Sequence, residues 1–256
     1  MLRRWIAVPA AALVVGGAAP ACSQVLSRPP CTATAGTGHM TLQVDQAANA
    51  TTIAAVGKRL GVPDHGVTIA LATALQESKL RNLTGGDRDS VGLFQQRPSQ
   101  GWGARAELLD PRFAATAFYA HLTKIDGWEQ LAVTAAAQRV QHSGAPDAYA
   151  RWEASARILA QALTGEVPAG LTCTVHAPGT QGGLDAALTA DVGPGALGTP
   201  VPPPRGWLVA SWLVARAGLY PISTVSFDGR RWSAASGRWD SDPTATSAVT
   251  VTGPSR

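Results

Sequence analysis

Apolar residues recur at helical spacing along the first two thirds of the chain, from about residue 45 to residue 165. The second of the expected helices is apolar on nearly every side, which indicates that other helices surround it. The third opens with Asp110 and Pro111, an acidic N-cap followed by a proline at the first turn. The pattern predicts helices at about residues 45–61, 63–78, 110–122, 129–141 and 146–163. We therefore expect a mainly α fold, with one helical domain over residues 31–175.

A long segment without helical periodicity, about residues 82–108, interrupts this domain. It is rich in Gly and Asp near its start and carries Gly92-Leu93-Phe94-Gln95 in its middle. Loops of this length inside a compact domain are usually functional. We expect the functional residues of the protein to lie in or near this segment.

The amino-acid composition changes after the helical region. Residues 176–204 are dominated by Gly, Pro, Ala and Thr, a composition that predicts a linker without a packed core. Residues 205–252 predict a small α+β module of one helix and about three strands. Its helix covers 206–219, and a hairpin turns at Asp228-Gly229, a pair that favours a type I′ turn. A module of this size has little stability of its own, so we expect it to dock on something.

Aromatic residues are concentrated in this C-terminal module. Four of the eight tryptophans are Trp207, Trp212, Trp232 and Trp239. Large aromatic side chains in small modules usually build the core, and carbohydrate or cell-wall binding is the alternative interpretation.

The first residues are typical of an export signal. Arg3 and Arg4 precede an apolar stretch, and small residues around Ala21 resemble a cleavage site, which predicts a signal peptide over residues 1–21. The stretch is shorter than the roughly 20 residues of a membrane-spanning helix. Cys22 follows directly and is a candidate for lipid attachment. We expect a secreted or cell-envelope protein, with a lipid anchor at Cys22 as the alternative to a freely soluble form.

The two other cysteines, Cys31 and Cys173, lie on either side of the helical region. In an oxidising compartment an even pair favours a disulfide over two free thiols. Such a bond would close a long loop and restrict the unfolded chain.

Charge and composition exclude several classes of function. The formal net charge is +4, and no block of Lys and Arg indicates nucleic-acid binding. The five histidines show no metal-ligand spacing, and no phosphate-binding or dinucleotide motif is present. The sequence therefore predicts no metal and no cofactor.

Glu77 is a lone carboxylate at the end of the apolar second helix. A solvated helix-end residue is the ordinary interpretation. However, burial and the negative end of the helix dipole both disfavour a charged carboxylate there. A carboxyl group kept protonated is what general acid catalysis requires.

Short motifs from Glu77 to Pro111 resemble those of a known protein superfamily. Glu77-Ser78, then Gly92-Leu93-Phe94-Gln95, then Asp110-Pro111 resemble the lysozyme-like superfamily over about residues 45–165. The chain is most similar to lytic transglycosylases and goose-type lysozymes, and more distantly to resuscitation-promoting factors of actinobacteria. It departs from the transglycosylases on a later helix, where Ala135 to Ser143 lack their Asn-Ala-Gly signature.

The resemblance implies a role for each matching residue. Glu77 would protonate the glycosidic oxygen of peptidoglycan and then act as a base. Ser78 would orient the carboxyl group or the substrate, and Gln95 with the backbone of Gly92, Leu93 and Phe94 would hold the sugar. For Ser78 and Gln95 the alternatives are capping and loop hydrogen bonds.

A hydrolase usually needs a second carboxylate, and Asp87 and Asp89 are the candidates. Turn formation in a Gly-rich loop is the alternative role for both. The function expected is thus that of an exported glycosidase acting on peptidoglycan glycan strands. A catalytically silent cell-wall-binding or scaffold protein is the alternative, with a cell-envelope protein as the partner of the C-terminal module.

Overall fold

The computed structural model describes residues 31–253; the predicted signal peptide, residues 1–21, and Cys22 lie outside this range. The helices are α1 (Val44–Arg59), α2 (Asp64–Ser78), α3 (Arg105–Leu108), α4 (Pro111–Leu122), α5 (Val133–Gln141), α6 (Glu153–Thr164), α7 (Leu184–Val192) and α8 (Pro203–Val214). The strands are β1 (Cys31–Ala35), β2 (Gly38–Leu42), β3 (Leu171–Cys173), β4 (Thr224–Phe227), β5 (Arg230–Ser233), β6 (Arg238–Ser241) and β7 (Thr250–Thr252). Short 3₁₀ turns cover Pro98–Gln100, Trp128–Gln130 and Pro146–Trp152.

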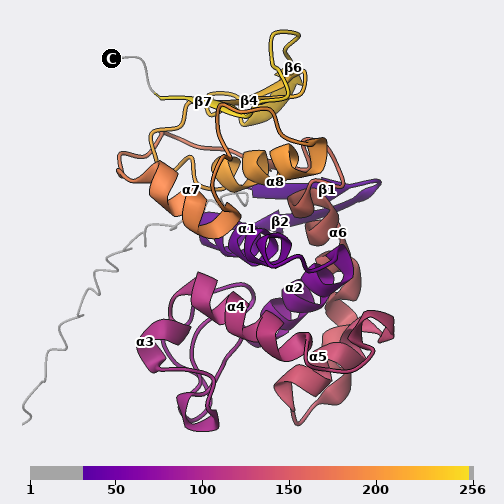
Figure 1. Ribbon diagram of the computed structural model, residues 1–256. Coiled ribbons are helices and arrows are strands. Elements are labelled where there is room, and N and C mark those ends of the chain that lie inside the picture. Colours follow the sequence, from indigo (N-terminus) through magenta and orange to yellow (C-terminus); the bar gives the residue numbers. More distant parts are fainter. Residues whose placement is uncertain (1–30, 254–256) are drawn as a thin grey trace, which may run out of the picture.

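The expected helices form, and α2 is surrounded as its apolar sequence predicted. It packs against α1, α4, α5 and α6, and its residues from Gly66 to Leu75 are all buried (Figure 1). Asp110 caps α4, since its carboxylate accepts a hydrogen bond of 2.8 Å from the amide of Arg112. The fifth expected helix is divided into a 3₁₀ turn, Pro146–Trp152, and α6.

The expectation of a mainly α fold is wrong. Two antiparallel sheets are present, one with the order β2-β1-β3 and one with the order β6-β5-β4-β7. The first sheet uses residues 31–42, which the helical periodicity did not include, and residues 171–173. The described chain therefore combines helices with two small sheets.

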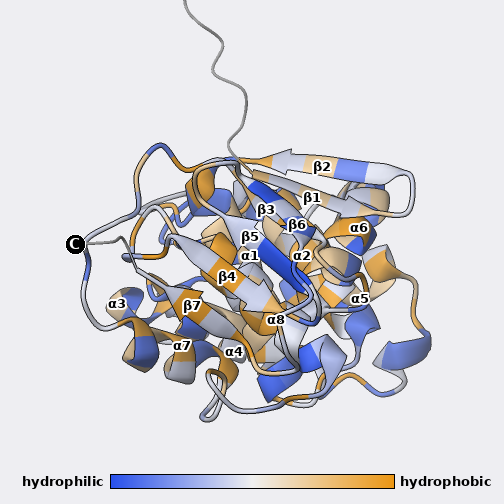
Figure 2. Ribbon diagram, turned by 90° about the horizontal axis from the view of Figure 1, so that it is seen from above, coloured by the Kyte–Doolittle hydropathy of each residue, from blue (hydrophilic) through white to orange (hydrophobic). Residues whose placement is uncertain are grey.

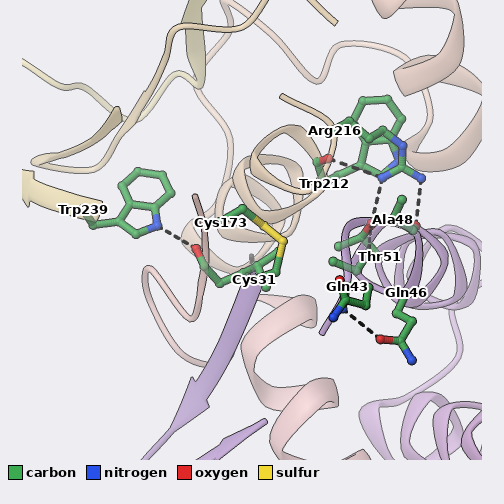
Figure 3. The surroundings of a disulfide bond; sticks show 11 residues. Cys31, Gln43, Gln46, Ala48, Thr51, Cys173, Trp212, Arg216 and Trp239 are labelled. Atoms are coloured by element: carbon green, nitrogen blue, oxygen red, sulfur yellow. Dashed lines mark hydrogen bonds between the residues drawn. A yellow bond between two sulfur atoms is a disulfide. The ribbon is translucent and has the colours of Figure 1, made fainter. Parts of the chain in front are cut away.

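The disulfide between Cys31 and Cys173 forms as expected. These residues face each other in the antiparallel pairing of β1 with β3 (Figure 3). The bond therefore joins the beginning of the helical region to its end. A disulfide is typical of proteins in an oxidising compartment.

The expectation of an unstructured linker over residues 176–204 is also wrong. Helix α7 forms within it, and Leu188, Asp191, Val192 and Ala196 are buried. The composition is poor in large apolar residues, but those present pack on α1 and α8 instead of on one another.

Asp191 of α7 is the centre of a buried polar network. Its carboxylate lies 2.7 Å from Nε of Arg112 in α4 and 3.4 Å from Nη2 of Arg216, which follows α8. It also accepts hydrogen bonds of 2.9 Å from Thr52 in α1 and 2.8 Å from the indole of Trp212 in α8. Four helical segments are thereby tied to one carboxylate.

Arg216 makes the remaining contacts of this network. Its guanidinium donates to Oγ1 of Thr51 at 2.7 Å and to the carbonyl of Ala48 at 3.0 Å, and it lies over the Trp212 ring (Figure 3). Burial lowers the pKa of Arg216 to about 10. The C-terminal segment is thus fixed to α1 by hydrogen bonds as well as by apolar packing.

The C-terminal residues form the expected helix and hairpin. Asp228 and Gly229 both have positive φ, as a type I′ turn requires, and β4 pairs with β5 across them. The sheet has four strands instead of about three and lies over α8 (Figures 1 and 2). The expectation that the tryptophans build a core is confirmed for Trp207, Trp212 and Trp232, all of which are buried.

Candidate functional site

An open cleft of about 760 Å³ lies where the end of α2 meets the loop over residues 82–108. Helices α4 and α5 supply the other sides. Most of the lining side chains are polar, and the lining residues are Glu77, Asp87, Ser90, Gln95, Gln96, Arg97, Gln100, Trp102, His121, Val140, Gln141, His142 and Ser143.

Glu77 is the lining residue that comes from the buried helix α2. It lies one residue before the end of that helix and is half-buried. Its Oε1 accepts a hydrogen bond of 2.7 Å from the hydroxyl of Tyr149. The Tyr149 side chain is fully buried, and burial followed by the bond to Glu77 raises its pKa. The phenol therefore stays protonated and holds the carboxylate in one place.

Ser78 lies next to Glu77 in sequence but does not line the cleft. It is buried, and its hydroxyl approaches the carbonyls of Leu93, at 2.7 Å, and Ala74, at 3.1 Å. The hydroxyl therefore joins the end of α2 to the loop. The sequence allowed two roles for Ser78, orienting the carboxyl group or substrate and making a capping or loop hydrogen bond. The geometry matches the second role.

Replacing Ser78 with alanine is expected to lower the free energy of unfolding by about 1–2 kcal/mol, because the buried Leu93 carbonyl loses its partner. Urea unfolding of the two proteins measures this difference. Thr116→Ser, which keeps a hydroxyl on the half-buried side of α4, is the control substitution. An unchanged midpoint for Ser78→Ala would show that water replaces the lost bond.

The segment Gly92-Leu93-Phe94 supports the cleft from behind. Leu93 and Phe94 are fully buried, and Phe94 stacks on Phe118 of α4 with ring centroids 4.7 Å apart. The three carbonyls accept hydrogen bonds from Gln95, Ser78 and Gln141 respectively. These residues lie outside the cleft lining, so they position the loop and do not present the sugar contacts that the resemblance implied.

Gly92 has a geometric reason for being glycine. Its φ is +79°, and a Cβ there would lie 2.4 Å from the carbonyl oxygen of Leu108. Its amide donates to the carbonyl of Leu83 at 2.8 Å. The return of the loop across the cleft depends on this close approach.

Gln95 does line the cleft, opposite the end of α2. Its side-chain amide donates to the carbonyl of Gly92 at 3.1 Å, and its Oε1 accepts from Ser90 at 3.1 Å. A Cβ at Gly86 would lie 1.7 Å from this Oε1, so the Gly-rich turn allows Gln95 its position. Two of the residues quoted for the resemblance, Glu77 and Gln95, are thus brought to one cleft.

The two candidate second carboxylates differ in their surroundings. Asp87 lines the cleft, and its side chain is almost fully exposed. Asp89 lies outside the lining and binds the amide and hydroxyl of Ser99 and the guanidinium of Arg97. These hydrogen bonds, that of the Ser99 amide first, lower the pKa of Asp89 well below its usual range. Asp89 therefore fastens the loop, and Asp87 is the carboxylate that remains available.

Several residues in or beside the cleft were not among the predicted site residues. Tyr149, which contacts Glu77 from outside the lining, lies within the helix expected over residues 146–163, and Gln141 and His142 lie at the end of α5 with no motif around them. Trp102 and His121 come from the loop and from α4, and their rings lie 4.0 Å apart. No local signal links these positions, because the chain brings them together only through tertiary packing.

Within residues 31–253, no three His, Cys, Asp or Glu side chains gather in a way that could hold a metal ion. No helix in the same range has the length and apolar character needed to cross a membrane.

Comparison of the sequence with models of known protein families gives no match, and none of the curated proteins is significantly similar to it. The functional assignment therefore depends on the cleft itself.

Proposed function

We propose that the protein is an exported glycosidase that cleaves peptidoglycan, as a lytic transglycosylase or a muramidase, with Glu77 as general acid and base. The observation that carries this proposal is the position of Glu77, a carboxylate held by a buried phenol in an open cleft. The neighbouring side chains Gln95, Gln100 and Gln141 are uncharged amides. Amides and an aromatic ring suit a neutral, hydroxyl-rich polymer better than a charged one.

The reaction needs one proton donor at the glycosidic oxygen. Protonated Glu77 gives its proton to the leaving oxygen as the bond to the anomeric carbon breaks, and the carboxylate then accepts a proton. In a transglycosylase that proton comes from the C6 hydroxyl of the substrate, and in a muramidase it comes from water. Tyr149 acts through Glu77 as a positioning residue.

The identity of the product depends on Asp87. A hydrolase requires a group that activates water or stabilises the developing cation, and Asp87 is the other carboxylate in the cleft lining. A transglycosylase requires no such group because the substrate supplies its own nucleophile. Substitution of Asp87 by asparagine should abolish activity in the first case and leave most of it in the second.

Export agrees with the disulfide and with the predicted signal peptide. A disulfide such as that between Cys31 and Cys173 is typical of an oxidising compartment, and peptidoglycan lies in one. A lipid anchor at Cys22 is the second form of the same proposal.

The alternative is a catalytically silent protein that holds glycan strands. It is favoured by helix α5, which lacks the Asn-Ala-Gly signature of transglycosylases and uses Gln141 to bind the carbonyl of Phe94. The cleft would then bind sugar with no bond cleavage.

Digestion of purified peptidoglycan, with the released fragments identified by mass, tests the proposal. Anhydro products from the wild-type protein and none from Glu77→Gln would establish a transglycosylase, and hydrated reducing ends would establish a muramidase. No release by either protein, with sedimentation on peptidoglycan retained, would reject the enzyme and support the binding protein.

A further inference from the structure

A second cavity, of about 280 Å³, lies away from the proposed catalytic cleft and shares none of its lining residues. It is enclosed by the ends of α1, α6 and α7 and by the beginning of α8. Its lining residues are Ala55, Lys58, Arg59, Thr164, Val192, Pro202, Pro204, Arg205 and Leu208. Aliphatic and proline side chains form most of the wall, and three cations lie among them.

An unpaired buried polar group lies behind the wall of the cavity. Thr164, the last residue of α6, is 2% exposed, and its hydroxyl has no hydrogen-bond partner within the described residues. Buried hydroxyls are almost always paired, because leaving one unpaired costs stability. Its Oγ1 is covered by protein atoms, so the hydroxyl lies behind the cavity wall and out of reach of a ligand.

The cations of this wall are only partly neutralised. Lys58 pairs with Asp64 at 2.7 Å. The side chains of Arg59 and Arg205 form no ion pair within residues 31–253, and Arg205 donates only to the carbonyl of Pro194, at 2.9 Å. The cavity wall therefore carries excess positive charge beside apolar surface.

Helix electrostatics account for one of these two arginines. Arg59 ends α1, where a cation is favoured by the helix dipole. Arg205 lies in the first turn of α8, where the same effect disfavours a cation. The hydrogen bond to the carbonyl of Pro194 holds Arg205 beside the cavity. An anion bound between the two guanidinium groups would offset the unfavourable position of Arg205 at the helix N-terminus.

We propose that this cavity binds a small anionic amphiphile, with its acidic head between Arg59 and Arg205 and its hydrocarbon body against Val192 and Leu208. A water molecule takes about 30 Å³, so the space holds about nine non-hydrogen atoms. That is the size of a medium-length acyl chain.

Titration of the purified protein with octanoate, followed by amide NMR shifts, tests the proposal. Octanoate is expected to shift residues of α1, α6 and α8 around the cavity and to bind at least tenfold more tightly than octan-1-ol or octylammonium. Octyl phosphate distinguishes the head group: tighter binding than octanoate would identify a lipid-like phosphate, and weaker binding a carboxylate, and both support the site. Equal binding of octan-1-ol and octanoate, or shifts elsewhere, would overturn it.

Substitutions provide the second part of the test. Arg205→Gln and Arg59→Gln are each expected to weaken octanoate binding several-fold, while Arg157→Gln, on the same molecule but paired with Glu153, should leave it unchanged. Thr164→Val should leave octanoate binding unchanged and the unfolding midpoint unchanged or higher, since it removes an unpaired buried hydroxyl that the ligand does not reach. Unchanged affinity in both arginine variants would reject the anion site.

Discussion

Glu77→Gln is expected to lower the rate of glycan cleavage by about 10³-fold, within the range of 10²–10⁴ typical of a general acid. Glutamine has the same shape, and its carbonyl can still accept the hydrogen bond from Tyr149, so the cleft should keep its geometry. The loss would therefore report the missing proton. Release of soluble fragments from peptidoglycan, measured against protein concentration, gives the rate.

Two further variants make this result interpretable. Tyr149→Phe removes the bond to the carboxylate but leaves the proton donor, so a smaller loss of about tenfold and an altered pH profile are expected. Glu166→Gln, just beyond the end of α6 and away from the cleft lining, is the matched control and should retain full activity; Glu166 accepts a hydrogen bond from Gln161. If Glu77→Gln retained wild-type activity, Glu77 could not be the acid, whichever product is formed.

Asp191→Ala should destabilise the protein by about 3–5 kcal/mol, the effect of removing one member of a buried ion pair. The substitution leaves the guanidinium of Arg216 buried without its carboxylate and leaves the indole of Trp212 and the hydroxyl of Thr52 without an acceptor. Urea unfolding followed by far-UV circular dichroism measures the change, as a shift of the midpoint at constant slope.

The control substitution lies on the same helix, and the compensating substitution lies in the network. Asp185→Ala, at the exposed beginning of α7, should cost less than about 1 kcal/mol. Adding Arg216→Met to Asp191→Ala should recover part of the lost stability, because the unpaired buried charge is then removed. A double variant no more stable than Asp191→Ala would show that packing around α7, and not the charge, is what the carboxylate maintains.

The helices could be predicted from the sequence because each carries its own signal. Asp110 and Pro111 mark the start of α4, and the apolar run before Glu77 marks α2 as a buried helix. Strand β3 has no such signal, since it has three residues and its partner β1 lies more than 130 residues away. Strand β1 also pairs with β2 in a local hairpin, which a search for helical periodicity does not detect. Helix α7 was missed for a related reason: its buried residues are stabilised by α1 and α8, which a local composition cannot reveal.

In the candidate site, too, the residues that belong to a local motif were predicted and those brought together by tertiary packing were not. Glu77 and Gln95 were found because they belong to a recognisable local pattern, and both line the cleft. Tyr149 lies 72 residues from Glu77 and occupies an ordinary apolar position in its own segment. Ser78 was expected either at the substrate or in a capping or loop hydrogen bond, and its hydroxyl bonds the loop. The backbone of Leu93 and Phe94 was expected at the substrate, but their carbonyls accept hydrogen bonds from Ser78 and Gln141. A local motif does not specify which partners its groups meet in the folded chain.

The packing of α8 and α7 against α1 has a consequence for how the protein can be dissected. A fragment ending near residue 175 would retain Glu77 and the cleft but would expose Thr51, Thr52 and Ala55 of α1, all of which are buried in the whole chain. It would also leave Arg112 without its carboxylate partner on α7. The segment that resembles a self-contained catalytic domain in the sequence is therefore expected to aggregate when expressed by itself, and soluble protein should require the chain through β7.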